Sequence, residues 1–496
     1  MSFFSTRGES CVTASQAILR GIAPDGGLYV PAMFQAVPPE RLTTLTEMNY
    51  EERAVVILKR FLEDFSIREI EDAVKAAYSR ERFRHPDVAP IVKMDPATWA
   101  LELFHGPTLA FKDIALQLLP HLLKLSAEKN GEDREVCILV ATSGDTGKAA
   151  LEGFRDVAGT SCTVFYPLEG VSDVQKLQMV TTGGSNTHVI AVKGNFDDAQ
   201  TGVKELFCSE SFREEMAKRG KVLSSANSIN LGRLVPQVVY YFSAYADLLK
   251  QHAVAPGDPV NFCVPTGNFG DILAAYYAMN MGLPVNRLIC ASNENKVLFD
   301  FFRTGVYDRN REFHLTSSPS MDILLSSNLE RLIWLLCGQS AAENRKLMQE
   351  LAETGRYTIS EEMKAGLASF CGYYADEAET AQTIKKIYES DRYIIDPHTA
   401  VAACAYEKYR QDSGDDAVTV IASTASPYKF THSVLSAIDA KYEACADFDL
   451  IAPLKELSGV PVPGAIREIL DAPVKHTTVC GRDEMTSVVK GFLGIG

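Results

Sequence analysis

Two stretches of similar design decide the fold: VCILVATSGDTGKAALEGF at 136–154 and VNFCVPTGNFGDILAAYYAM at 260–279. Each begins with an apolar, β-branched run, passes through a Gly-containing turn and continues with apolar residues at helical spacing. Runs that are apolar at successive positions are typical of buried parallel strands, which need a crossover helix between neighbours. The same pattern recurs in CTVFYP (162–167), HVIAVKG (188–194), RLICAS (287–292) and AVTVIAST (417–424). The sequence therefore predicts an α/β protein built on parallel sheets.

The composition limits the classes of function. The chain has 496 residues, of which 46% are hydrophobic and 23% charged, as in folded proteins of several domains. A net charge of −15 disfavours binding to nucleic acid or to an anionic membrane surface. The eleven cysteines contain no C-x-x-C pair, so we expect free, mostly buried thiols in a reducing compartment and no metal site. No apolar run approaches the ~18 residues of a membrane span, and we expect a cytoplasmic protein.

The two Gly-containing turns are the first candidate sites, because parallel sheets bind ligands beyond the carboxyl ends of their strands. The turn at 142–147 is not an ATP-binding P-loop, since Thr142 and Ala149 occupy positions that require Gly and Ser or Thr. It leads into a helix N-terminus that suits a carboxylate or a phosphate, and a simple helix cap with no ligand is the alternative. In the second turn, Gly267 and Gly270 allow a ligand to approach the backbone closely, as a phosphate would, and an ordinary turn is the alternative.

A lysine and a hydroxyl complete the candidate chemistry. Lys112 lies among apolar residues in ELFHGPTLAFKDIALQLLPHLL (102–123), where burial lowers the pKa of an amine and prepares it for Schiff-base formation. A lysine that reaches solvent from a helix start is the alternative. Thr424, in IASTASPYKF (421–430), places a hydroxyl at a strand end, which can bind a heteroaromatic nitrogen or serve only the loop. His105, near the lysine, is open to a structural or a catalytic role.

The sequences of these motifs resemble those of the threonine synthase family, in the longer branch found in bacteria and fungi. The resemblance rests on motifs spread over most of the chain: SQAILRGIAPDGGLYVP (15–31), FHGPTLAFKD (104–113), ATSGDTG (141–147), SINLGRLVPQ (228–237), PTGNFGD (265–271), SPSMDI (318–323), SSNLERL (326–332) and STASPYKF (423–430). It implies a tryptophan-synthase-β-like, fold type II enzyme that depends on pyridoxal 5'-phosphate, with an additional N-terminal domain. The implied division is an N-terminal domain at 1–90, a large cofactor domain at 91–130 and 221–440, a small mobile domain at 131–220, and a C-terminal extension at 441–496.

The resemblance also implies roles for individual residues. Lys112 would form the Schiff base with the cofactor and shuttle protons, and Thr424 would face the pyridine nitrogen. The cofactor phosphate would be held by Gly267, Asn268, Phe269, Gly270 and Asp271. The substrate would be bound by Thr142, Ser143, Asp145, Thr146, Ser228, Asn230 and Arg233, with the last three at the substrate phosphate.

The activity that this implies is a carbon–oxygen lyase reaction acting on phosphate, in which O-phospho-L-homoserine and water give L-threonine and phosphate. A threonine-synthase-like phospho-lyase, which releases phosphate and a 2-oxo acid, is one alternative. A catalytically silent homologue that binds the cofactor is another alternative, and the presence of Lys112 and Arg233 argues against it. We expect a monomer or small homo-oligomer whose partner is the small-molecule substrate, with no metal, nucleic acid or membrane.

Overall fold

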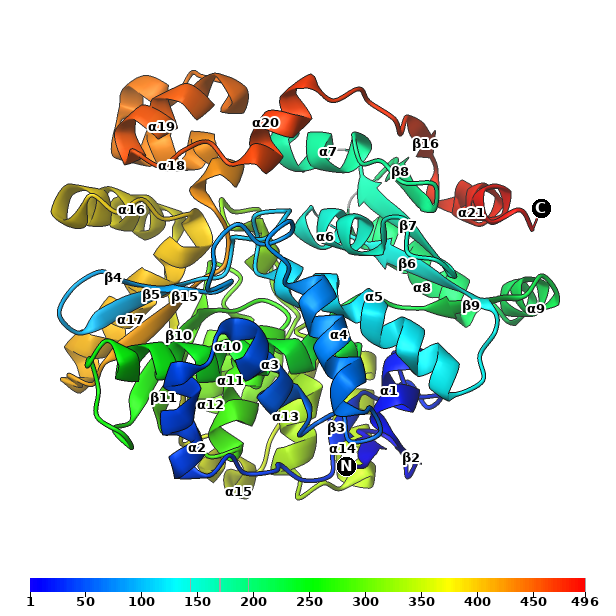
Figure 1. Ribbon diagram of the computed structural model, residues 1–496, viewed down its shortest axis with the longest axis horizontal. Coiled ribbons are helices and arrows are strands. Elements are labelled where there is room, and N and C mark those ends of the chain that lie inside the picture. The colour runs from blue at the N-terminus through cyan, green and yellow to red at the C-terminus, as the bar shows by residue number, and fades with distance from the viewer. Residues whose placement is uncertain (143, 169–170, 195, 496) are drawn as a thin grey trace.

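The computed structural model describes residues 1–142, 144–168, 171–194 and 196–495. Two sheets form the centre of the molecule, and the N-terminal helices pack beneath them (Figure 1). In the larger sheet the neighbouring strands run parallel, apart from the antiparallel pair at one edge. Its spatial order is β14 (Phe370–Tyr374), β11 (Val285–Ser292), β10 (Val260–Pro265), β15 (Thr419–Ser423), β5 (Thr98–Glu102) and β4 (Ile91–Lys93).

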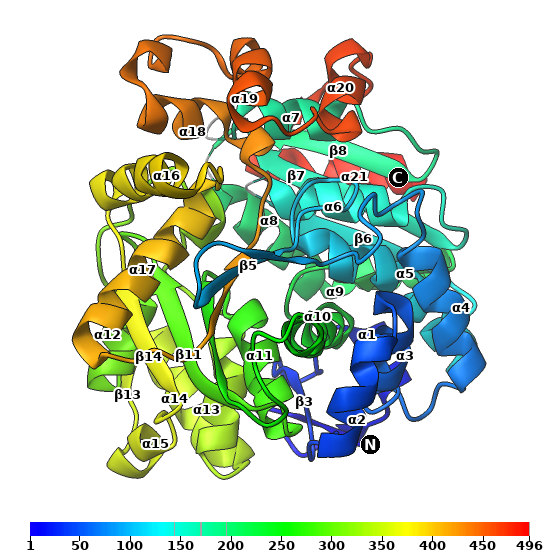
Figure 2. The ribbon, with the colours of Figure 1, turned by 60° about the vertical axis from the view of Figure 1, so that its left-hand side comes forward.

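The connections of this sheet place helices on both of its faces. Helix α11 (Gly270–Asn280) joins β10 to β11, whereas α17 (Pro397–Ser413) precedes β15, on the way back across the sheet. Because such crossovers are right-handed, connections that run in opposite directions lie on opposite faces. Both helices pack on the central strands (Figure 2). This double cover explains why the strand sequences are apolar at successive positions.

The smaller sheet is parallel throughout and carries the first Gly-containing turn at its centre. Its order is β16 (Thr478–Cys480), β8 (Thr187–Val192), β7 (Thr160–Pro167), β6 (Glu135–Ala141) and β9 (Lys221–Ser224). Helix α6 (Asp145–Phe154) follows β6 and packs on β7, and α7 (Asp173–Val180) lies beside α6. All six predicted strand runs are therefore confirmed, and the predicted α/β class with them.

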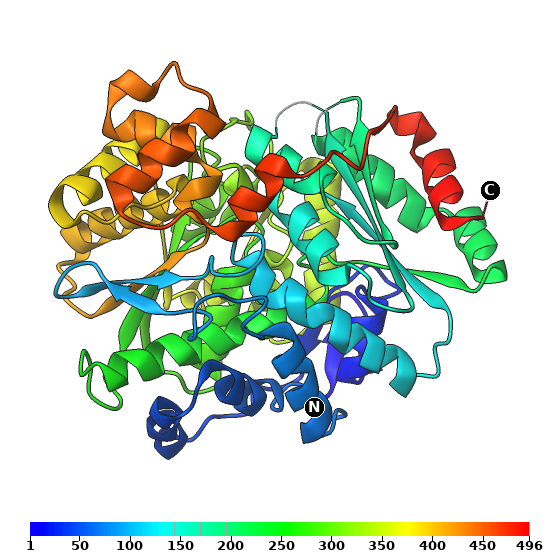
Figure 3. The same cartoon turned by 45° about the horizontal axis from the view of Figure 1, so that its top comes forward.

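Strand pairing departs from the expected domain division at two points. Strand β9 begins at Lys221, which we assigned to the large domain, yet it pairs with β6 of the smaller sheet. Strand β16 lies in the C-terminal extension and pairs with β8. Figure 3 shows the C-terminal segment crossing from the helices beside the larger sheet to the smaller one. Both strands are short edge strands, so their sequences carry too few alternating residues to reveal the sheet they join.

The N-terminal region forms a small antiparallel sheet of β2 (Cys11–Val12), β1 (Phe3–Ser5) and β3 (Tyr29–Pro31), followed by helices. Two of these helices, α3 (Tyr50–Leu58) and α4 (Ile67–Ala77), each start with a capping box. They pack on α5 (Lys112–Lys129) and α10 (Leu231–Lys250), and α10 lies centrally between α3 and α11 (Figure 2). Within the described ranges, no helix is long and apolar enough to cross a membrane.

Candidate functional site

Lys112 is the first residue of α5 and lies beside Asp145 at the start of α6. Its side chain is 13% exposed, with Nζ 3.7 Å from Asp145 Oδ2, and it donates a hydrogen bond of 3.1 Å to Ser320 Oγ. Burial lowers the pKa of Lys112 to about 8; Asp145 opposes this effect, while the cations of Lys429 and Arg233 add to it. About a tenth of Lys112 is therefore the neutral, nucleophilic amine at pH 7, far more than for a lysine in water.

The first turn presents Asp145 to this lysine. Thr142 Oγ1 accepts hydrogen bonds of 2.9 Å from the backbone N–H groups of Gly144 and Gly147, and so fixes the start of α6. Asp145 is 5% exposed, and its Oδ1 accepts a hydrogen bond of 2.9 Å from Gln175 Nε2. Thr146 is half-buried in the first helical turn, and Ser143 lies outside the described residues.

A second lysine, Lys429, also binds Asp145. Lys429 is fully buried, and its Nζ pairs with Asp145 Oδ1 and donates a hydrogen bond of 3.1 Å to the carbonyl oxygen of Thr108. Burial alone would raise the pKa of Asp145, but the ammonium groups of Lys429 and Lys112 and the amide of Gln175 hold it well below its usual range. Asp145 is therefore an ionised carboxylate between two lysines.

The second turn joins β10 to α11, and the backbone N–H groups of 267–272 donate to no other group among the residues that the structure describes. Phe269 adopts a left-handed conformation with φ of 64°, and the first helical amide to find a backbone carbonyl is that of Leu273, which donates to Phe269 O. Ser326 Oγ donates a hydrogen bond of 2.8 Å to Gly267 O, and the Asn328 amide nitrogens donate to Asn268 O. The preceding N–H groups, at the positive end of the helix, are available to an anion.

Asp271 in this turn points at tyrosines of α10. Its Oδ1 accepts hydrogen bonds from Tyr240 and, at 2.6 Å, from Tyr241, whereas Oδ2 has no partner among the residues described. Burial raises the pKa of Asp271 to about 6, against the opposing effect of the two tyrosine hydroxyls. We expected Asp271 at a cofactor phosphate; the structure gives its Oδ1 to the tyrosines and leaves Oδ2 as its free oxygen.

The expected substrate-phosphate residues divide into two kinds. Asn230 is fully buried and caps α10: Oδ1 accepts a hydrogen bond of 2.9 Å from Gly232 N, and Nδ2 donates to the carbonyl oxygens of Ile18 and Ser225. Its polar atoms are therefore used within the chain, because the helix start needs a capping side chain. Ser228 Oγ accepts a hydrogen bond of 3.1 Å from Asn328 Nδ2.

Arg233 is different, because it is buried and forms no ion pair within the described structure. The side chain is 2% exposed, one terminal nitrogen donates to Ala226 O, and Nε has no partner in the described structure. Among the described residues no carboxylate lies within ion-pair distance of it, and burial lowers its pKa to about 10. A buried guanidinium without an acid is costly unless a ligand supplies the anion.

Thr424 lies directly after β15, close in space to the lysine loop. Its carbonyl oxygen accepts a hydrogen bond of 2.8 Å from Phe111 N, and Ala425 bridges to Ala110. The residue is 4% exposed, and its backbone lies beside Phe111, the residue that precedes Lys112. His105 Nε2 lies 2.8 Å from Glu102 Oε2, which gives this histidine a structural partner.

The sequence reasoning missed Lys429, Ser320, Gln175 and a buried pair, Asp396 and His398. His398 Nδ1 lies 2.6 Å from Asp396 Oδ2, and His398 Nε2 accepts a hydrogen bond of 3.2 Å from Ser320 N. Lys429 and Ser320 stand inside motifs that carried the resemblance, STASPYKF and SPSMDI, which was the available signal. Gln175 had none.

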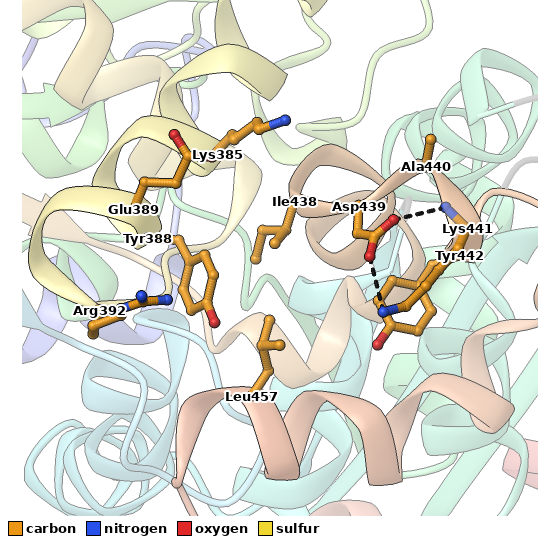
Figure 4. Close-up of a pocket in the computed structure, with 10 residues that line it drawn as sticks. All are labelled: Lys385, Tyr388, Glu389, Arg392, Ile438, Asp439, Ala440, Lys441, Tyr442 and Leu457. Atoms are coloured by element: carbon orange, nitrogen blue, oxygen red, sulfur yellow. Dashed lines mark hydrogen bonds and ion pairs between the residues drawn. The ribbon is translucent and has the colours of Figure 1, made fainter.

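A separate crevice of about 530 Å³ lies on the outer surface, between α16 (Glu377–Asp391) and the segment around Asp439 (Figure 4). Charges of both signs surround it, and Asp439 and Lys441 pair at 2.8 Å. None of its lining residues is a candidate named above. Within the described ranges, no cluster of His, Cys, Asp and Glu could hold a metal ion, and the eleven cysteines are free, with Cys11 and Cys208 exposed rather than buried.

Comparison with known families accounts for nearly the whole chain. Family models match in order: "Threonine synthase N terminus" at 2–78, "Pyridoxal-phosphate dependent enzyme" at 84–424 and "Threonine synthase, C-terminal" at 399–479. The chain belongs to the threonine synthase family. The expected tryptophan-synthase-β-like architecture of this family, with its additional N-terminal domain, is confirmed.

Individual members of the threonine synthase family agree. Threonine synthase of Schizosaccharomyces pombe is 38% identical over 471 residues, which cover 89% of this chain and 90% of that protein. The crystal structure of "PLP bound Threonine synthase from Brucella melitensis" is 38% identical and superposes with a TM-score of 0.86 over 99% of each chain. Threonine synthase-like 1 of Pongo abelii is 40% identical over 89% of this chain, which spans only 61% of that longer relative.

Proposed function

We propose that this protein is a pyridoxal 5'-phosphate-dependent threonine synthase that converts O-phospho-L-homoserine and water to L-threonine and phosphate. The observation that carries the proposal is that two anion-binding features occur with Lys112: the buried Arg233, which has no ion pair in the described structure, and the turn before α11. A cofactor phosphate and a substrate phosphate require two such positions in one site. Membership of the threonine synthase family supports this assignment.

The residues present fit the proposed cofactor. Lys112 offers a buried amine with a lowered pKa, to which an aldehyde can attach. The turn of Gly267, Asn268, Phe269 and Gly270 offers free N–H groups at the start of α11 for the phosphate. The hydroxyl of Thr424 would face the ring nitrogen without charging it, as the resemblance implies.

The cofactor, when bound, supplies an electron sink that makes protons beside the substrate nitrogen removable. Lys112 Nζ would hold it and then accept and return protons, with Ser320 Oγ and Asp145 Oδ2 fixing the position of that nitrogen. Arg233 would bind the substrate phosphate through its guanidinium, supported by Ser228. The first turn, with Thr142, Asp145 and Thr146, would close the site from the smaller sheet.

We further propose that the protein works in the cytoplasm, as a monomer or small homo-oligomer, and that its two sheets form a large cofactor domain and a small mobile domain. The expected division of the chain stays a proposal, and the pairing of β9 and β16 with strands of the smaller sheet supports including both in the small domain. Movement between the domains would exclude water from the reacting substrate until its addition is required.

A phospho-lyase is the second candidate, because threonine synthase-like 1 relatives share 40% identity with this chain. Such an enzyme would use the same lysine and anion sites but release phosphate and a 2-oxo acid. A silent cofactor-binding protein is a weaker candidate, since it would need neither a reactive Lys112 nor a buried Arg233.

The test is to incubate the cofactor-loaded protein with O-phospho-L-homoserine and measure both phosphate and the organic product. Threonine in amounts equal to phosphate is expected. Phosphate with 2-oxobutyrate would support the lyase. The absence of turnover, in a protein that still binds the cofactor, would favour the silent homologue.

A further inference from the structure

Lys429 belongs to the larger sheet's side of the site. It ends a short 3-10 helix, Pro427–Lys429, that follows β15. The preceding Ser426 donates its backbone N–H to Leu109 O at 3.0 Å, which ties this segment to the loop before Lys112. The Lys429 ammonium donates to Thr108 O in the same loop. The position of Lys429 relative to Lys112 is therefore set by backbone contacts.

Asp145 approaches from the other side, at the start of α6, next to the smaller sheet. Its two oxygens are divided between the partners. Oδ1 binds Lys429 and Gln175, whereas Oδ2 faces Lys112 Nζ at 3.7 Å and accepts a hydrogen bond of 3.3 Å from Ser320 Oγ. The ion pair between Asp145 and Lys429 thus connects the two sheets and is the closer of the two lysine contacts.

The charges around Lys112 make this pair more than a structural contact. The charged and titratable groups that face Lys112 are Asp145 on α6, Lys429 after β15, Arg233 on α10 and Asp271 on α11. Asp145 stabilises the ammonium form of Lys112, and Lys429 opposes it. If Asp145 had no other cation, its full negative charge would act on Lys112 and keep that amine protonated.

We propose that Lys429 is a positioning residue of the active site, which holds Asp145 between the two domains and balances its charge so that Lys112 keeps a reactive amine. This inference rests on the role of Lys112 in the proposed function, but not on the substrate or the product. Within the described structure Lys429 does not contact the Lys112 amine; it acts through its ion pair with Asp145 and through its charge at a distance. The coupling predicts that removing Lys429 and removing Asp145 shift the protonation of Lys112 in opposite directions.

The experiment measures cofactor capture rather than turnover. Each purified variant is freed of cofactor and mixed with pyridoxal 5'-phosphate at a series of pH values. The absorbance of the lysine-bound cofactor is plotted against pH, and the pH at which it is half-maximal is the midpoint. Lys429→Met should raise this midpoint by about one pH unit, and so slow capture about tenfold at neutral pH. Asp145→Asn should lower the midpoint, because Lys429 then acts on Lys112 without its counter-charge.

Further variants keep the test decisive. Lys429→Arg retains the charge, and the double variant D145N/K429M removes both partners, so both should stay within about half a pH unit of the wild type. Lys148→Met is the matched control: Lys148 is also buried, pairs with Glu152 at 3.0 Å and donates to Thr182 Oγ1, and its loss should lower stability without moving the midpoint.

The proposal is overturned if K429M and D145N shift the midpoint in the same direction, or if K429M leaves it unchanged. If K429M alone does not fold, a shift above about one pH unit in K429R or in the double variant overturns it equally. Because no substrate is present, a failure here is independent of whether the enzyme makes threonine.

Discussion

The two Gly-containing turns, 141–147 and 265–271, share one local design and reach opposite electrostatic states. In each, a parallel strand ends, the chain turns, and an aspartate stands in the first turn of a buried helix. Asp145 meets two ammonium groups and is held ionised, with a pKa well below its usual range. Asp271 meets two tyrosine hydroxyls, and burial raises its pKa to about 6.

This difference comes from tertiary partners and not from the turns themselves. The partners of Asp145 come from the region after β15 and from α5, and those of Asp271 from α10. The first turn therefore presents a charge that positions a lysine. The second presents free backbone N–H groups to an anion, with an acid that is readily neutralised behind them.

The largest effect is expected from Lys112→Ala, which removes one of the two cations beside Asp145 in the first turn and leaves the second turn intact. Threonine formation should fall by at least about 10²–10⁴-fold, because the proton-transferring amine is lost. Circular dichroism should show an unchanged fold, since Lys429 still balances Asp145. Turnover within tenfold of the wild type would contradict the role of Lys112.

Asp271→Asn tests the opposite charge states through pH, in protein freed of cofactor. The folded-state pKa of Asp271 is about 6, above that of an unfolded aspartate, so the folded protein binds the extra proton and is less stable as pH rises. Between pH 4 and 7 the wild type should lose about 2 kcal/mol of unfolding free energy relative to D271N. Denaturant unfolding at several pH values measures this.

Asp145 has the reverse dependence. Its pKa is depressed, so its stabilisation is present above the unfolded value of about 4 and is lost as pH falls below it. A D271N difference that is flat with pH, or grows in the other direction, would show that the two aspartates do not differ as described.

Gly270→Ala probes whether a ligand approaches the second turn. An added Cβ would lie 3.5 Å from Asn328 Nδ2, which is ordinary contact, so the fold should tolerate it. Cofactor affinity should nevertheless fall by about tenfold, because the methyl group obstructs a phosphate on the helix N-terminus. Fluorescence or absorbance titration gives the dissociation constant.

Gly267→Ala is the contrasting control, because its Cβ would lie 2.5 Å from the backbone oxygen of Ser320 and force a shift. This variant should lose about 1–3 kcal/mol of stability as well as affinity. Unchanged cofactor affinity in a stable G270A protein would place the phosphate elsewhere.

The smallest effect is expected from Thr142→Val. The hydroxyl of Thr142 accepts two backbone hydrogen bonds at the start of α6, so its loss should cost about 1 kcal/mol, measured by denaturant unfolding. KM for the phosphorylated substrate should change little. A rise in KM of tenfold or more would instead make Thr142 a direct substrate contact.

The sequence predicted those parts of the fold and site that depend on local pattern. The six apolar runs became strands because strands covered on both faces need apolar side chains throughout. Lys112, Gly267 and Gly270 were candidates because a lysine among apolar residues and a Gly-containing turn are visible in short windows, and their roles stay predictions. Strands β9 and β16 escaped prediction, since short edge strands carry little pattern.

The electrostatic connections could not be predicted in the same way. Asp145 and Lys429 are 284 positions apart in sequence, and only the folded chain shows that they form a pair. Asn230 resembled a ligand-binding residue, yet its amide caps α10 and contacts the N-terminal region. A polar residue before a helix has the same local signature in both roles, and burial decides between them.

The most direct test of the central claim follows the oxygen of water. The cofactor-loaded enzyme is given O-phospho-L-homoserine in ¹⁸O-labelled water, and the products are identified by mass spectrometry. The account predicts L-threonine with ¹⁸O in its hydroxyl group and an equal amount of phosphate released without ¹⁸O. Phosphate accompanied by 2-oxobutyrate, or homoserine with labelled phosphate, would contradict it.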